Sequence, residues 1–244
     1  MIFKFWRAVA DLLFPRCCEV CGRELLLYER YLCLGCLAEM PLTYYWLYRD
    51  NPAEVVFWGR SYVDRVWSLF FYTQSYRNLV HSLKYKSNVP IGLWLGAMLG
   101  EKIDEPVDYI IPVPLHWRKK LKRGYNQSEI IAKGVVDGIK RRISSNRSAQ
   151  SEKVLQMPII ITDLLVRRSF TKTQTHKDRQ ERWHNVSAAF SINEAALKKY
   201  NLRGRKALII DDVLTTGATL EACASLLVEQ LGCRVSIATL AYVE

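Results

Sequence analysis

The sequence predicts an α/β fold, a parallel sheet flanked by helices, with a small unit before it. Three short apolar runs, at 107–113, 206–213 and 233–241, are typical of strands that are buried on both faces. The last two are joined by a helical pattern, which makes a βαβ unit. With 244 residues, half of them hydrophobic, the chain can form one sizeable domain and an appendage. We therefore expect an N-terminal unit over residues 1–50 and an α/β domain over residues 51–244.

The chain is strongly basic. Its formal net charge is +11 and its pI is about 9.4, which favours attraction to polyanions: nucleic acid, an anionic membrane surface or phosphorylated substrates. No run of about 18 uncharged apolar residues occurs, so no membrane-spanning helix is expected. Five of the seven cysteines lie between Cys17 and Cys36. This bias indicates a local metal site in a reducing compartment rather than a disulfide framework, and hence a cytoplasmic protein.

Residues 1–14 have the pattern of an amphipathic helix. Apolar side chains recur at helical spacing on one side, three charged side chains lie on the other, and Pro15 ends the helix. The segment lacks the small-residue cleavage site of a secretory signal. We expect its apolar side to pack on the domain that follows. The alternative is an interfacial helix, which would place the protein at the periphery of the inner membrane.

Two Cys-x-x-Cys pairs follow, eleven residues apart. Each pair aims two thiolates at one point across a tight turn. Together, Cys18, Cys21, Cys33 and Cys36 would complete the closed tetrahedral shell of a structural Zn2+ ion. The alternative is a redox Cys-x-x-Cys motif, which needs only one such pair. Because four cysteines leave no open coordination position, we expect this zinc knuckle to be architectural.

The first part of the α/β domain predicts strands and two helices. Residues 54–72 are rich in Val, Phe, Trp and Tyr and are interrupted by an Asp-Arg pair, which predicts a hairpin or two short strands. Apolar spacing predicts a helix over 75–86 and a second helix that begins at Pro90. Lys84 has two interpretations: it complements the carboxyl end of the first helix, or it faces a pyrophosphate.

A basic segment at 115–127 follows the strand at 107–113 and is expected to be a loop. In an open α/β sheet the ligand lies at the carboxyl ends of the strands, so this loop should lie on the ligand-binding edge. Arg118 and Arg123 would then bind a pyrophosphate leaving group through their guanidinium forks. The alternative is a solvated cationic loop, because most charge runs are no more than that.

The next part of the chain predicts one long helix and two polar segments. Residues 126–143 have helical spacing, and residues 144–151 are polar without any apolar period, as expected for a flexible loop. Residues 171–190 carry polar side chains at near-helical spacing, which predicts a mobile lid over the site or, alternatively, a solvent-facing helix. Cys223 and Cys233 are expected in the core. The polar side chains of the third segment are Thr173, Gln174, Arg179, Arg182 and Asn185.

The most informative stretch is Ala207-Leu-Ile-Ile-Asp-Asp-Val-Leu-Thr-Thr-Gly-Ala-Thr219. A buried strand leads into two carboxylates, a small hydroxylic loop and a new helix. The N–H groups and the dipole at the amino end of that helix favour an anion, and Gly217 lets the backbone come close. Asp211 and Asp212 suit a ribose diol or a hydrated divalent cation. The stretch therefore predicts a ribose-phosphate site.

This stretch resembles the 5-phosphoribosyl 1-pyrophosphate (PRPP) motif of type I phosphoribosyltransferases. The resemblance implies a type I phosphoribosyltransferase-like fold with PRPP as its ligand. It implies that Asp211 and Asp212 hold the ribose hydroxyls, directly or through Mg2+, and that the loop and the first helical turn hold the 5′-phosphate. The residues that it assigns to the phosphate are Thr215, Thr216, Gly217, Ala218 and Thr219.

Further motifs resemble the ComF family. They are Phe-Pro at 14–15, the paired Cys-x-x-Cys motifs, Pro-Val-Pro at 112–114, Arg-Gly-Tyr-Asn-Gln at 123–127, Gln174 with Arg182 and Asn185, and Ala-Ala-Phe at 188–190. Members are bacterial proteins associated with competence, the internalisation of single-stranded DNA in natural transformation. They share a phosphoribosyltransferase-like domain behind an N-terminal zinc knuckle. Two departures stand out: Tyr125 replaces the usual Phe, and residues 142–158 form a longer segment than usual.

Two functions follow. As a DNA-uptake protein, the chain would bind PRPP and would hold single-stranded DNA by phosphate contacts and by stacking on Trp117, Tyr125 and Trp183. It has no Walker A lysine motif, so the ComF resemblance implies a partner helicase and a membrane DNA-import channel. The residues expected to contact DNA are Arg118, Lys119, Lys120, Lys122, Arg123, Arg179 and Arg182.

The alternative is an active phosphoribosyltransferase, which would transfer ribose 5-phosphate from PRPP to a nitrogen acceptor in nucleotide metabolism. Its catalytic residues would be Asp211 and Asp212 with Mg2+, and Arg118 and Arg123 at the departing pyrophosphate. The barrier would fall mainly through stabilisation of the charge on pyrophosphate.

Overall fold

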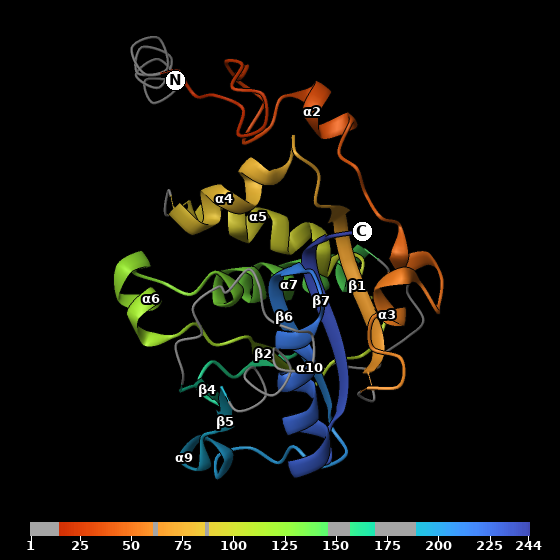
Figure 1. Cartoon of the computed structure of the whole chain (residues 1–244). Helices are drawn as coiled ribbons and strands as arrows, with labels where there is room; N and C mark the ends of the chain where they lie inside the picture. The colour runs from red at the N-terminus through yellow and green to blue at the C-terminus, as the bar shows by residue number, and fades with distance from the viewer. Residues whose placement is uncertain (1–14, 61–62, 86–87, 146–156, 169–188) are drawn as a thin grey trace.

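A computed structural model describes residues 15–60, 63–85, 88–145, 157–168 and 189–244. Five strands form one parallel sheet in the order β1, β7, β6, β2, β3 (Figure 1). These strands are β1 (Val63–Phe71), β2 (Tyr109–Pro112), β3 (Ile159–Ile160), β6 (Lys206–Leu214) and β7 (Arg234–Tyr242). The α/β fold with a parallel sheet is therefore confirmed, and three of its strands are those that the apolar runs predict.

Helices cover both faces of this sheet. α4 (Arg77–Tyr85), α5 (Val89–Gly100) and α7 (Gln127–Ser145) lie on one face, and α10 (Ala218–Ser225), continued by the turn Leu226–Gln230, lies on the other (Figure 1). Successive residues of β6 alternate between the two cores: Leu208 and Ile210 pack with α5 and α7, whereas Ala207 and Ile209 pack with α10. This double burial explains why the strands read as continuous apolar runs.

The backbones of α5 and α7 are in direct contact. A Cβ at Gly96 of α5 would lie 2.4 Å from the carbonyl oxygen of Ile131, and one at Gly138 of α7 would lie 2.1 Å from that of Ala97. No side chain larger than hydrogen fits at either position without moving a helix. The positions of α5 and α7 relative to each other are therefore fixed, next to β2 and β6.

The described chain before β1 packs on both faces of the sheet. α2 (Leu34–Ala38) belongs to the cysteine knuckle, whose buried residues share a core with α4 and α5. The chain then runs along β1, where Thr43 N–H donates to the carbonyl of Leu69 at 3.1 Å. It continues through the short helix Tyr45–Leu47 into α3 (Pro52–Val55), which packs in the core on the α10 face.

The prediction of a hairpin or two short strands over 54–72 is wrong. Where the structure describes the segment after α3, residues 56–60 and 63–72, it contains one strand, β1, and the Asp-Arg pair lies inside it. Arg65 is only 3% exposed, but its Nε lies 3.6 Å from Glu54 Oε1 and 3.8 Å from Glu105 Oε1. Because these two carboxylates pair with the buried guanidinium, the charge does not break the strand.

The prediction that 115–127 is a loop is also wrong. The segment contains a helix, α6 (Trp117–Arg123), which stands out from the body of the domain (Figure 1). His116 caps its start by accepting a hydrogen bond from Arg118 N–H at 3.3 Å. Gly124 ends it with a left-handed φ of 81°. The two caps, rather than an apolar stripe, define this helix.

The helices predicted over 75–86 and from Pro90 are present as α4 and α5. α7 extends through Ser145, so the predicted flexible loop at 144–151 begins with two helical residues, whose hydroxyls donate to carbonyls one turn earlier. A second, antiparallel sheet pairs β4 (Leu165–Arg167) with β5 (Phe190–Ile192), followed by α9 (Glu194–Leu197). Cys223 and Cys233 are buried, as predicted.

Several predictions fall outside the described residues. These are the helix over 1–14, residues 171–188 of the expected lid, and the DNA contacts assigned to Arg179 and Arg182 with stacking on Trp183. Among the helices within the described ranges, none combines the length and the apolar character that crossing a membrane requires.

Candidate functional site

The carboxyl end of β6 carries the two adjacent carboxylates of Asp211 and Asp212, called here the twin carboxylates. The chain then turns through residues 215–217 into α10. Among the described residues, no side chain caps the start of α10, so its first-turn N–H groups remain available to a ligand. Asp211 lies within electrostatic reach of α10: burial, and after it the charge of Asp211, raises the pKa of Cys223 in that helix. The carboxylates and the helix mouth thus meet at one edge.

Gly217 is required by the packing behind the loop. Its φ is 77°, a left-handed conformation that favours glycine. A Cβ at this position would lie 2.7 Å from Val56 Cγ1 and 3.2 Å from Phe57 Cε1. The segment that follows α3 therefore presses on the back of the loop and leaves its other side, with the exposed Thr215 and Thr216, open to solvent.

The twin carboxylates have different surroundings. Asp211 Oδ1 accepts hydrogen bonds from Ser128 Oγ at 3.0 Å and from the backbone N–H of Asp212 at 2.9 Å. Burial, together with the negative charge of Asp212, raises the pKa of Asp211 to about 7. Asp212 Oδ2 instead lies 2.8 Å from Lys84 Nζ. One carboxylate is paired with a cation, and the other carries a charge that a proton or a cation would relieve.

Lys84 reaches this edge from the end of α4. Burial alone would lower the pKa of its ammonium, but the charges of Asp212 and Asp211 raise that pKa above its ordinary value. The side chain therefore does more than complement the carboxyl end of its helix. It lies beside the twin carboxylates, at the carboxyl ends of the strands.

Three further cations lie within electrostatic reach of Lys84 or Asp211. Burial lowers the pKa of Arg167 in β4, and the Asp211 carboxylate acts in the opposite direction. Burial and the charges of Arg167, Arg123 and Lys84 lower the pKa of Lys119 in α6. These four cations, Lys84, Lys119, Arg123 and Arg167, are called here the edge cations. Their shared neighbourhood favours a polyanion.

Arg167 is a candidate residue that the sequence does not single out. It belongs to no recognised motif and lies in β4, outside the parallel sheet, where the charge of Asp211 acts on it. Its Cζ lies 5.2 Å from the centroid of the Phe190 ring in the neighbouring strand, a cation–π contact that orients the guanidinium.

The Arg-Gly-Tyr-Asn-Gln motif at 123–127 connects the end of α6 and the start of α7 to α4 and to the end of β2. Tyr125 Oη and Gln127 Nε2 both donate to the carbonyl of Leu83 at the end of α4. Asn126 Nδ2 donates at 2.9 Å to a carbonyl just after β2. Because Lys84 follows Leu83 directly, the motif fixes that lysine relative to α6 and α7.

The remaining part of α6 faces solvent. Trp117 and Leu121 are 57% and 75% exposed, and no residue of α6 is buried. Arg118 Cζ lies 5.2 Å from the Trp117 ring centroid. The five basic residues of this segment thus divide: two are edge cations, and three lie on what we call the exposed face of α6, together with Trp117. These three are Arg118, Lys120 and Lys122.

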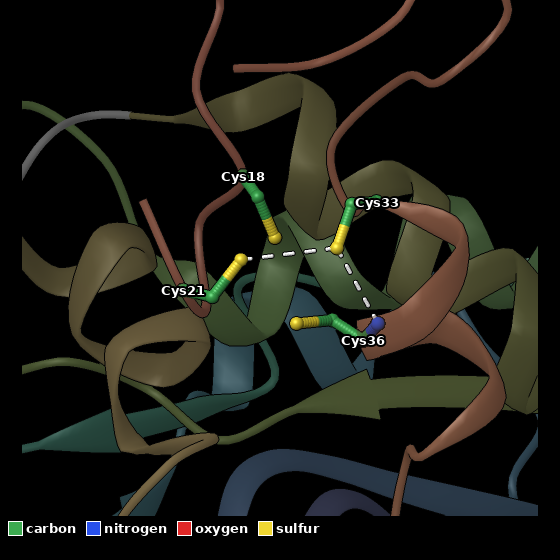
Figure 2. A group of neighbouring side chains, drawn as sticks. All are labelled: Cys18, Cys21, Cys33 and Cys36. Carbon is green, nitrogen blue, oxygen red and sulfur yellow. Dashed lines mark hydrogen bonds between the residues drawn. The ribbon is translucent and has the colours of Figure 1, made fainter. Parts of the chain in front are cut away.

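The four predicted metal ligands converge at a second site, the cysteine knuckle (Figure 2). The sulfur atoms of Cys18, Cys21, Cys33 and Cys36 all lie within 4.8 Å of one another, and Cys21 Sγ lies 3.8 Å from Cys33 Sγ. An ion with four metal–sulfur bonds of about 2.3 Å holds its ligands roughly 3.8 Å apart. The donor set and the spacing therefore fit a metal ion such as Zn2+. Cys17 lies outside this group.

A buried carboxylate holds the two halves of the knuckle together. Glu29 is 4% exposed and accepts hydrogen bonds from Leu26 N–H at 2.8 Å and from Leu34 N–H at 2.7 Å. These two hydrogen bonds lower the pKa of Glu29. Leu34 begins α2, so the carboxylate also caps that helix. No sequence motif marks Glu29, because its partners are backbone groups.

Comparisons with known proteins agree with this architecture. The model of the phosphoribosyl transferase domain matches residues 121–244, just over half of the chain. The chain is 26% identical to Competence protein F of Haemophilus influenzae, over 88% of this chain and 79% of that protein. It is 26% identical to DNA utilization protein YhgH of Salmonella typhi, over 71% of this chain and 70% of that protein.

The protein of the same description from Escherichia coli K12 is 25% identical, over 65% of this chain and 63% of its own length. The region matched to the domain model contains β6, the twin carboxylates and α10, and the cysteine knuckle precedes it. The resemblance to the ComF family is confirmed by these matches. The chain therefore belongs to the phosphoribosyl transferase domain family, as a ComF-like member with an N-terminal cysteine knuckle.

Proposed function

We propose that the chain is a competence-type protein of DNA uptake that binds PRPP at the carboxyl end of β6. The observation that carries this proposal is the ion pair of Lys84 with Asp212 at 2.8 Å, beside Asp211 and close to the start of α10, with the other edge cations in electrostatic reach of Lys84 or Asp211. A ligand that carries both a diol and several phosphates suits this arrangement. The names of the relatives, a competence protein and DNA utilization proteins, support the cellular role.

Each part of PRPP has a counterpart among these residues. Asp211 and Asp212 would hold the ribose hydroxyls and Mg2+, and the raised pKa of Asp211 is a sign of negative charge that a cation would relieve. The N–H groups and hydroxyls of residues 215–219 would hold the 5′-phosphate. The edge cations would hold the pyrophosphate. Mg2+, when bound, supplies further positive charge to the pyrophosphate.

We propose Zn2+ as the ion of the cysteine knuckle. Four thiolates at tetrahedral spacing suit zinc, and they leave no position for a reacting water. Burial would raise the pKa of the Cys18 thiol, but hydrogen bonds from the backbone of the knuckle lower it to about 7. This thiol is thus prepared to bind a metal as its thiolate.

The exposed face of α6 supports the proposal of single-stranded DNA binding. It presents three cations and an exposed Trp117 on a helix that stands out from the body of the domain (Figure 1). Cations along a backbone path and an aromatic ring for base stacking are the usual elements of sequence-tolerant binding to single strands. The DNA would therefore pass next to the ligand site.

Thermal unfolding tests the PRPP site. Mg·PRPP at 100 times its Kd should stabilise the folded protein by about 2.7 kcal/mol, by mass action. Asp211→Asn should abolish this shift. The matched control Asp104→Asn, at an exposed position of the same domain, should keep it. Equal shifts for the two variants would remove the twin carboxylates from the proposal.

Fluorescence anisotropy with a labelled oligo-dT tests DNA binding. Replacing Arg118, Lys120 and Lys122 by Ala should weaken binding and should reduce the slope of log K against log salt, because fewer counterions are released. The control replaces Lys133, Lys140 and Lys198, which are exposed elsewhere, and removes the same charge. If the two triple variants lose affinity equally, binding depends on net charge and not on α6.

A second candidate function is phosphoribosyl transfer itself. It is favoured by the position of the edge cations, since a pyrophosphate leaving group needs charge stabilisation more than it needs a general base. The test is release of pyrophosphate from Mg·PRPP with ammonia, glutamine and the common nucleobases as acceptors. Release that depends on an acceptor and is lost in Lys84→Met would establish an enzyme. Binding without release would leave a PRPP-binding protein.

A further inference from the structure

The cysteine knuckle contacts the helices that lead to and from Lys84. We infer that the knuckle sets the position of Lys84 at the ligand-binding edge, with Glu19 and Asn88 as positioning residues. This inference rests on the proposed PRPP site and gives the knuckle a part in ligand binding that a merely architectural element would not have.

The first contact fixes the start of α4. Tyr76 immediately precedes α4, is 6% exposed, and donates from Oη to the carbonyl of Cys36 at 2.5 Å. A metal ligand is thus hydrogen-bonded to the residue that precedes α4, the helix that carries Lys84 in its last turn.

The second contact fixes Asn88, the cap of α5, which lies four residues after Lys84. Asn88 Nδ2 donates to Glu19 Oε1 at 2.9 Å, and Asn88 Oδ1 accepts from Ile91 N–H at 3.4 Å as the cap of α5. Glu19 lies in the turn between Cys18 and Cys21, and its own N–H donates to the carbonyl of Tyr31 at 3.1 Å. The turn that carries Cys18 and Cys21 is therefore hydrogen-bonded to Asn88, the residue that caps α5.

Apolar packing joins the same elements. Leu79, Val80 and Leu83 of α4 share one core with the buried cysteines of the knuckle, and the ring centroids of Tyr31 and Trp94 in α5 lie 5.5 Å apart. α4 has only nine residues, so its direction depends on what it packs against. The knuckle holds it on one side, and the hydrogen bonds to Leu83 from residues 123–127 hold its carboxyl end on the other.

A substitution that breaks the link without touching a metal ligand tests the inference. Asn88→Asp keeps an acceptor for the cap of α5 but replaces the donor to Glu19 with a repelling carboxylate. Its affinity for Mg·PRPP, measured by calorimetry, should fall about fivefold or more, as for other coupled residues. Glu19→Ala should act in the same direction, and Glu19→Gln, which still accepts from Asn88, should bind within about twofold of wild type. The control Glu24→Ala, exposed in the same knuckle, should bind normally.

Three further measurements make the result decisive. Metal content should stay at the wild-type value in Asn88→Asp, since no ligand is changed. In a Lys84→Met background, Asn88→Asp should have little further effect on affinity, because both changes act through the same lysine. Hydrogen exchange over residues 79–85 should accelerate in Asn88→Asp even without a ligand.

The failure of this inference is distinct from the failure of the proposed function. If wild type binds Mg·PRPP and Asn88→Asp binds equally well, the inference is overturned and the PRPP site stands. If wild type does not bind Mg·PRPP, the proposed function fails, and unchanged exchange over residues 79–85 would overturn the positioning role as well. An affinity loss that is fully additive with Lys84→Met would also overturn it, since the link would then not act through Lys84.

Discussion

Lys84 Nζ lies 2.8 Å from Asp212 Oδ2, although α4 and β6 are more than a hundred residues apart in the chain. The ion pair connects the last turn of α4 to the carboxyl end of β6, a central strand of the sheet. It keeps two opposite charges at the position where PRPP would need both. The protein thus holds the polar groups of the site in place before any ligand arrives, which lowers the cost of ordering them on binding.

Lys84→Met should weaken binding of Mg·PRPP by about tenfold or more, because a charge-assisted contact contributes about 1.5–3 kcal/mol. It should also leave Asp212 without its cation and lower the thermal midpoint of the free protein. Calorimetry and thermal unfolding measure the two effects. The control Lys140→Met changes an exposed lysine of α7 and should alter neither. Unchanged affinity in Lys84→Met would exclude the lysine from the site.

Asp211→Asn should stabilise the ligand-free protein at alkaline pH. The folded pKa of Asp211, about 7, lies above its ordinary value of 3.8, so between these pH values the folded chain binds a proton that the unfolded chain has released. Its contribution to stability is therefore fully present below about pH 4 and is lost as the pH rises through 7. The variant should gain on wild type over this window, by on the order of 1–3 kcal/mol at pH 8. Urea unfolding at pH 5 and pH 8, without added Mg2+ or PRPP, measures this difference. A gain that is independent of pH would contradict the raised pKa.

Gly138→Ala should destabilise the whole domain. The added methyl group would meet the carbonyl of Ala97 at 2.1 Å, so α5 and α7 would have to separate, at a cost of about 1–3 kcal/mol or more. Denaturant unfolding measures the loss. Lys133→Ala, at an exposed position of the same helix, should change stability by less than about 0.5 kcal/mol. Equal stability of the two variants would show that the helices separate freely.

Cys33→Ser should remove the metal from the knuckle. Elemental analysis of protein purified under reducing conditions should find about one zinc per chain in wild type and in the control Cys17→Ser, which changes a cysteine outside the cluster. The variant should lose the zinc and several kcal/mol of stability, since metal binding contributes to folding. Metal-free wild type with unchanged stability would contradict a structural ion.

The sheet could be predicted because its strands are buried on both faces. Residues 207–210 form an apolar run for that reason, and adjacent members pack in different cores. The hairpin expected around Arg65 was wrong because the sequence does not show that Glu54 and Glu105 meet this arginine inside the fold. The charges of Asp64 and Arg65 indicated an interruption of the strand, but the ion pairs of Arg65 with Glu54 and Glu105 allow the strand to continue.

The candidate site could be predicted only where it is local in sequence. Residues 207–219 are contiguous, so their strand, loop and helix mouth follow from the motif. Lys84, Ser128 and Arg167 come from three other elements, and only the topology brings them to the twin carboxylates. The helical form of α6 was missed because it has no buried stripe, and only its caps at His116 and Gly124 mark it.

Calorimetric titration of the wild-type protein with Mg·PRPP shows whether the twin carboxylates form a PRPP site. We expect saturable binding of one ligand per chain, competition by pyrophosphate, and loss of binding when Asp211 and Asp212 are both replaced by Asn. Absence of saturable heat with protein that is folded and contains its metal, or binding that survives the double replacement, would contradict this expectation.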